Sequence, residues 1–116
     1  MEHGKSNRKF GRETKQRLAL MRSLAVSLIS QNKIKTTSAK AKSLKVFIEK
    51  LVTKSRKNDL ATIKLLNAQV GTNAAAKLIK EIGPKFVDQK GGYTRISKLP
   101  PRISDGSAMA IIEFIK

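Results

Sequence analysis

The chain has 116 residues, a net charge of +17 and no cysteine, so disulfide bonds and thiolate metal sites are excluded. The length suits one domain with a modest core. No apolar run approaches the roughly 20 residues of a membrane span, and the first residues lack the apolar stretch of a secretory signal, so we expect no membrane insertion. Small folded domains ordinarily carry a net charge of about 2–8, so this excess predicts a polyanionic partner, with nucleic acid phosphate as the first candidate.

The positive charge is concentrated in the first half of the chain. Residues 1–57 hold 16 lysines and arginines against three glutamates, whereas residues 58–116 hold nine against five acidic residues. The opening dozen residues, MEHGKSNRKFGR, contain only two apolar side chains, too few for the buried face of a helix or strand. We therefore expect residues 1–13 to form a basic extension and residues 14–116 to form a single α+β globular domain.

Two long amphipathic helices are predicted after this extension. Residues 14–31 carry one apolar stripe, with Thr14 as the predicted N-cap and Asn32 as a left-handed stop. Residues 39–56 carry a second stripe with lysines on the other faces, and Ser38 is the predicted N-cap. Both stripes are expected to face the core.

Two shorter helices are predicted in the middle of the chain. One covers about 58–70 and ends at Gly71, and the other covers about 72–82. The Gly83-Pro84 pair is predicted to end the second one. The sequence thus predicts about four helices.

Three segments have the period of two that is typical of strands. They are KIKTT at 33–37, YTRISKL at 93–99 and the apolar segment at 108–115. A turn region separates the last two, with Asp105-Gly106 as its expected pivot. We expect a small three-stranded mixed sheet that ends in a C-terminal β-hairpin.

The sequence contains few candidate catalytic residues. His3 is the only histidine and the eight carboxylates are scattered, so we expect no enzyme activity, no metal and no cofactor. The GGYTR segment is more informative, because Tyr93 could stack on a nucleotide while Arg95 grips a phosphate. Tyr93 could equally enter the core at the start of a hairpin. The residues alone leave these two alternatives open.

Four segments occur in the order typical of one family. The arm MEHGKSNRKFGR resembles the pattern M-R-H-x-K-x-G-R-K-L-x-R, and KIKTTSAKAK at 33–42 resembles I-K-T-T-L-P-K-A-K. EIGPKF at 81–86 and GGYTRISKLPPRISDGSAMAIIEF at 91–114 resemble its closing signatures. The sequence is therefore identified as a member of the family of the seventeenth protein of the bacterial large ribosomal subunit. The departures from the family pattern are Glu2, Asn7, Gln16, Ser38 and Ala39.

The resemblance implies a structural constituent of the large ribosomal subunit. Such a protein binds large-subunit (23S-type) ribosomal RNA near the polypeptide exit region, helps to stabilise its folded form, and lies beside neighbouring ribosomal proteins. We expect a cytoplasmic, ribosomal location in a bacterium or an organelle, and no homo-oligomer. The RNA-binding candidates lie in the arm, the first helix, the K-T-T stretch and the C-terminal signature: His3, Lys5, Arg8, Lys9, Arg12, Lys15, Arg17, Arg22, Lys33, Lys35, Thr36, Thr37, Lys40, Lys42, Tyr93, Thr94, Arg95 and Arg102.

Two alternatives come from other functional classes. A nucleoid-type basic DNA-binding protein would need a dimeric recognition helix or a minor-groove arm, and the sequence has no clear dimer seam. A membrane-active cationic protein would need bulky exposed aromatic residues, but the aromatic content is only 4%.

Overall fold

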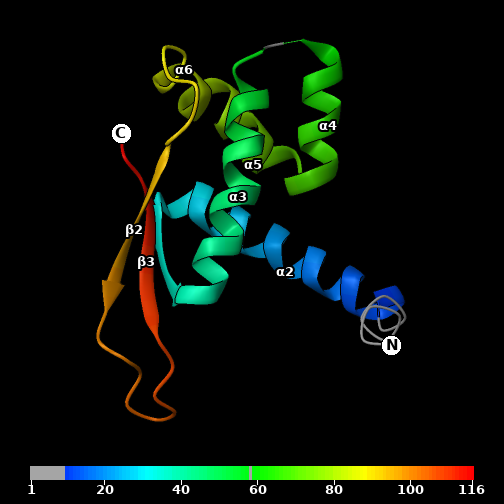
Figure 1. Ribbon diagram of the computed structural model, residues 1–116. Helices are drawn as coiled ribbons and strands as arrows, with labels where there is room; N and C mark the ends of the chain where they lie inside the picture. The colour runs from blue at the N-terminus through cyan, green and yellow to red at the C-terminus, as the bar shows by residue number, and fades with distance from the viewer. Residues whose placement is uncertain (1–9, 58) are drawn as a thin grey trace.

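The computed structural model describes residues 10–57 and 59–116, with side chains from Thr14 onward. Its helices cover one face of a small sheet (Figure 1), so the predicted α+β class is confirmed. In chain order the elements are α2 (Phe10–Gln31), β1 (Lys33–Thr37), α3 (Ser38–Ser55), α4 (Leu60–Val70), α5 (Thr72–Lys77), the π-helical turn η1 (Leu78–Ile82), α6 (Gly83–Lys85), β2 (Thr94–Leu99) and β3 (Met109–Phe114).

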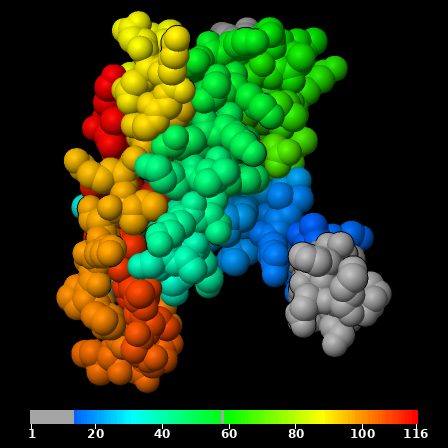
Figure 2. Space-filling view, in the orientation of Figure 1, coloured from blue at the N-terminus to red at the C-terminus, as the bar shows by residue number. Residues whose placement is uncertain are grey.

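Helix α2 begins at Phe10, so the prediction that Thr14 is its N-cap is wrong. The added residues include Arg12 and Glu13, and both residue types are good helix formers. Residues 14–20 are all exposed, and this half of α2 stands out from the body of the molecule (Figures 1 and 2). The predicted boundary after residue 13 therefore falls inside a helix. Asn32 ends α2 with φ 67°, as predicted.

The N-cap of α3 is one residue earlier than predicted. The hydroxyl of Thr37 accepts a hydrogen bond from the backbone N–H of Lys40 at 3.3 Å. Ser38 is the first helical residue instead, and its hydroxyl donates to the carbonyl of Met109 at 3.4 Å. The predicted capping role of Ser38 is therefore wrong, because the strand before it ends in a second residue able to cap.

Helix α4 ends at Val70 as predicted and begins at Leu60, two residues after the predicted start. A carboxylate oxygen of Asp59 accepts the backbone N–H of Thr62 at 2.8 Å and so caps the first turn. Gly71 ends the helix with φ 86°, a conformation that favours glycine.

The following helical segment does not stop at Gly83-Pro84, as the sequence predicts, but continues to Lys85. The N–H of Gly83 donates to the carbonyl of Leu78, the spacing of a π-helical turn. Helix α3 passes so close that a Cβ on Gly83 would lie 2.8 Å from the carbonyl oxygen of Ser55. Glycine serves close packing here, and Pro84 is tolerated because it lies in the first turn of α6.

The sheet has the strand order β1-β3-β2, and both pairings are antiparallel. The three strands and the C-terminal hairpin are confirmed, but the predicted mixed pairing is wrong. Two further backbone hydrogen bonds extend the β1–β3 pair at its two ends. The N–H of Phe114 donates to the carbonyl of Asn32 (3.1 Å), and the N–H of Ser38 donates to the carbonyl of Ala108 (2.9 Å). The direction of β1 relative to β3 depends on the path of the intervening helices, which the strand residues themselves do not encode.

The core lies between the helices and one face of the sheet. Ile34, Ile112 and Ile96 are cross-strand neighbours on this face. The central residue of the three, Ile112, is fully buried. The other face of the sheet has no helix against it (Figure 1), and we call it the open face.

Candidate nucleic-acid interface

One stretch of the chain combines dense positive charge with a lack of acidic residues. Residues 14–48 contain eight lysines and arginines and no aspartate or glutamate. Within this stretch, Lys45 pairs with Glu49 at 3.6 Å. Because it contains no acidic residue, the stretch attracts negatively charged molecules.

The fold brings the first helix and the K-T-T region together. Arg17 on α2 and Lys40 on α3 line one groove of about 440 Å³, which we call the α2–α3 groove. Its floor is completed by Leu20, Met21, Ala39 and Ser43. Lys15 and Lys42 on the same two helices are exposed. Arg17 and Lys40, which are far apart in the sequence, thus line one groove.

Arg22 has a different role from the other predicted cations of α2. It is half-buried, and its Nε donates to the side-chain oxygen of Gln69 on α4 at 3.3 Å. The guanidinium therefore ties α2 to α4.

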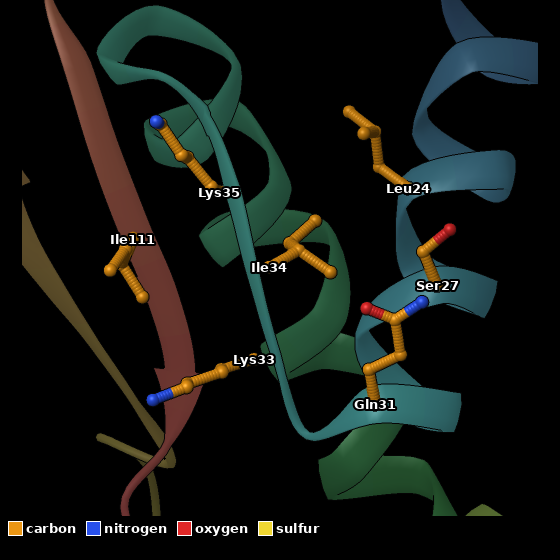
Figure 3. A pocket seen from close by; sticks show the side chains of 7 residues that line it. All are labelled: Leu24, Ser27, Gln31, Lys33, Ile34, Lys35 and Ile111. Carbon is orange, nitrogen blue, oxygen red and sulfur yellow. The ribbon is translucent and has the colours of Figure 1, made fainter.

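In the K-T-T stretch the lysines are exposed, whereas the threonines have structural roles. Lys33 and Lys35 are exposed and extend to the same side of β1, while Ile34 points to the other side (Figure 3). Both lysines line a shallow hollow of about 400 Å³ beside α2. Thr36 is only 7% exposed, and Thr37 caps α3. The lysines are available to a ligand, whereas Thr36 is buried and its contact with RNA stays a prediction.

Tyr93 lies in the core, which decides between the two alternatives that the sequence left open. Its side chain is 0% exposed, and its ring makes an edge-on contact with Phe86 at 5.1 Å between centroids. Thr94 is 4% exposed, and its hydroxyl donates to Glu49 at 3.0 Å. Both side chains are used inside the protein, which favours the core alternative for Tyr93, and their predicted contacts with RNA stay predictions.

Two predicted arginines are already paired with carboxylates. Arg95 lies 3.1 Å from Glu113 across the open face, and Arg102 lies 3.2 Å from Asp105 in the hairpin loop. The backbone N–H of Ser107 holds the pKa of Asp105 below its usual range, with a smaller contribution from Arg102. Both pairs are exposed and so add little stability, but they reduce the attraction of these arginines for phosphate.

The predicted RNA-binding residues of the arm lie outside the part of the chain whose side chains the structure describes. Their proposed contact with RNA stays a prediction. His3, Lys5, Arg8 and Lys9 lie outside the described residues, and so does the side chain of Arg12.

Two features of the surface were not predicted from the sequence. One is the acid-free stretch itself, which a count of acids between Glu13 and Glu49 would have revealed. The other is an apolar hollow in the hairpin loop, whose only signal is an isoleucine, Ile103, within an otherwise turn-like segment. Across residues 10–57 and 59–116, no three acidic or histidine side chains gather as a metal site, and no helix is long and apolar enough to cross a bilayer.

Comparison with known proteins identifies the family of this chain. A profile of the family described as ribosomal protein L17 matches residues 20–115. The chain is 51% identical to the large ribosomal subunit protein bL17 of Gemmatimonas aurantiaca, over 99% of this chain and 98% of that one. The bL17 proteins of Thermomicrobium roseum (47% identical, 99% of both chains) and Nautilia profundicola (46% identical, 99% and 98%) are similar over the same extent. The chain therefore belongs to the ribosomal protein L17 family, whose members are structural proteins and not enzymes.

Proposed function

We propose that the protein is a structural constituent of the large ribosomal subunit that binds large-subunit ribosomal RNA near the polypeptide exit region. Membership in a family of bacterial ribosomal proteins supports a ribosomal role in the cytoplasm. The observation that carries the RNA contact is the acid-free stretch at 14–48, which places Arg17 and Lys40 in one groove.

Binding through this surface is driven by phosphate neutralisation. Each lysine or arginine that meets a phosphate releases a condensed counterion, so affinity falls steeply with salt. Tyr93 and Phe86 are fully buried and Phe114 is nearly so, which keeps these rings from stacking on bases. The protein thus holds RNA segments by charge and shape, and it stabilises the RNA fold by lowering the repulsion between packed helices.

The RNA-binding surface that we propose is the α2–α3 groove, with Arg17 and Lys40 as its cations. Lys15 and Lys42 are exposed elsewhere on the same two helices, and their contact with RNA stays a prediction. Lys33 and Lys35 extend from the open face of the sheet and are not part of this groove.

The test is a binding titration of the full chain with a large-subunit RNA transcript at several salt concentrations. We expect log K to fall linearly with log salt, with a slope of about −0.7 to −0.9 for each phosphate neutralised. An affinity that does not change with salt would overturn phosphate-led binding. Equal affinity for duplex DNA of the same length would favour the nucleoid alternative.

The position near the exit region is tested separately by cryo-electron microscopy of intact large subunits. The fold should be found in density at the exit side of the subunit. Density for it elsewhere would refute the position without affecting RNA binding.

A further inference from the structure

The loop between β2 and β3 forms a hollow that the RNA contact does not use. The hollow has a volume of about 640 Å³ and lies where this loop meets the open face of the sheet. Most of its lining is apolar: Leu99, Pro100, Pro101, Ile103 and Met109. Ile103 is fully exposed, at 102% of its reference area. Together with the apolar lining, this isoleucine forms an exposed apolar patch of the kind that protein partners bind.

The loop is held in one conformation before any partner arrives. The N–H of Arg102 donates to the carbonyl of Ser107 at 2.8 Å, and the N–H of Gly106 donates to the carbonyl of Arg102 at 2.7 Å. The carboxylate of Asp105 accepts the N–H of Ser107 at 3.0 Å, and Arg102 also reaches the sulfur of Met109 at 3.4 Å. A preordered loop loses little conformational entropy on binding.

The charge of the loop distinguishes it from the RNA surface. Residues 99–108 contain one arginine and one aspartate, which pair with each other. A phosphate backbone gains little from this neutral segment, and no aromatic ring lines the hollow for a base to stack on. Lys35 is the remaining cation of the lining, and it occurs in none of the ion pairs among residues 10–57 and 59–116. The complement of such a site is an apolar side chain with a carboxylate beside it.

We propose that this hollow binds a bulky apolar side chain of a neighbouring protein of the large subunit, and that an adjacent carboxylate of that protein pairs with Lys35. The inference rests on the proposed ribosomal role, but it concerns a second surface with a different class of partner. Ile103 and the apolar lining form the dry centre of the contact, and Lys35 lies at its rim.

A photo-crosslinking amino acid at position 103 of the full chain, incorporated into purified large subunits, identifies what touches the hollow. We expect an adduct that resists ribonuclease and contains a peptide of another large-subunit protein, with an acidic residue next to a bulky apolar one. An RNA adduct, an adduct to a second copy of this chain, or no adduct would overturn the proposal. The matched control is position 87, where Val87 is 59% exposed but outside the hollow, and it should not capture the same peptide.

A substitution separates this contact from RNA binding. Ile103→Asp should leave affinity for the isolated RNA transcript within about twofold of wild type, yet reduce retention in large subunits during a salt wash by about tenfold. Val87→Asp should change neither quantity. Unchanged retention of Ile103→Asp would overturn the inference, whereas a wild-type chain that does not bind the transcript would overturn the proposed function. A thermal melt of each variant verifies that it is folded.

Discussion

The hydroxyl groups of Thr53 and Tyr93 lie 2.9 Å apart and join α3 to the segment that leads into β2. The hydroxyl of Tyr93 also donates a hydrogen bond to the carbonyl of Gln89 at 3.3 Å, so it accepts the hydrogen bond from the hydroxyl of Thr53. The single tyrosine of the chain is therefore held by two hydrogen bonds of its hydroxyl and by the contact of its ring with Phe86. The strongest candidate for base stacking in the sequence is thus part of the core.

Removing the hydroxyl of Tyr93 should affect stability and leave RNA binding unchanged. Tyr93→Phe should lower the free energy of unfolding by about 1 kcal/mol, because the hydrogen bond to Thr53 is removed. Tyr93→Ala should lower it by about 3–5 kcal/mol through the cavity it leaves. Urea denaturation measures both values. A Tyr93→Phe variant with wild-type stability but weaker RNA binding would contradict the buried role.

Gly83→Ala should destabilise the protein because α3 leaves no room for a methyl group. The new Cβ would meet the carbonyl and hydroxyl oxygens of Ser55 at 2.8 and 2.9 Å. Such overpacking costs about 1–3 kcal/mol, and the helix propensity of alanine recovers at most about 1 kcal/mol. Gly91→Ala is the control, since nothing lies within 4 Å of its Cβ position. Equal unfolding free energies for the two variants would show that contact with α3 does not require the glycine.

Glu49→Ala should loosen the start of β2. The Glu49 carboxylate, which is 22% exposed, accepts hydrogen bonds from the backbone of Gly92 at 3.3 Å and the hydroxyl of Thr94 at 3.0 Å. Loss of such bonds to a charged group costs about 1.5–3 kcal/mol. Chemical denaturation should show this loss for Glu49→Ala and a change within about 0.5 kcal/mol for Glu81→Ala, which removes an exposed carboxylate. Similar losses in both variants would refute the role of Glu49.

The N-cap of α4 should make stability depend on acid pH. The backbone N–H of Thr62 holds the pKa of Asp59 below its ordinary value of 3.8. A lowered folded-state pKa stabilises the protein above the unfolded-state value, and this stabilisation is lost as the pH falls through the folded-state value.

Asp59→Asn tests this dependence because asparagine also caps helices but has no charge to titrate. The melting temperature of the wild type should fall more steeply than that of Asp59→Asn once the pH drops below 3.8. Asp88→Asn, at an exposed site, is the control for the loss of one carboxylate. Parallel curves for the wild type and Asp59→Asn would count against the cap.

Neutralising the α2–α3 groove should weaken RNA binding and its dependence on salt. The double variant Arg17→Gln, Lys40→Gln should reduce the magnitude of the log K against log salt slope by about 0.7–0.9 for each phosphate that is no longer neutralised. Lys64→Gln with Lys80→Gln removes the same charge from exposed positions on α4 and η1. A smaller slope in both double variants would mean that net charge, and not this groove, governs binding.

Local sequence signals predicted much of the architecture correctly. The apolar stripes predicted the long helices, and Asn32 and Gly71 ended helices where expected. These features depend on hydrogen bonds and side-chain periods within a few residues, so the residues themselves encode them. The concentration of charge in the first half and the ribosomal family are also properties of the sequence.

Other features depend on residues that meet only after folding. The GGYTR pattern is compatible with an exposed or a buried ring, and Tyr93 is buried because Thr53 and Phe86 approach it from distant elements. The local pattern predicts a helix stop at Gly83, yet the close passage of α3 is what requires this glycine. The antiparallel register places Glu113 opposite Arg95, a pairing that neither segment predicts by itself. Short-range periodicity sets helices and strands, whereas tertiary packing decides which side chains remain available to a partner.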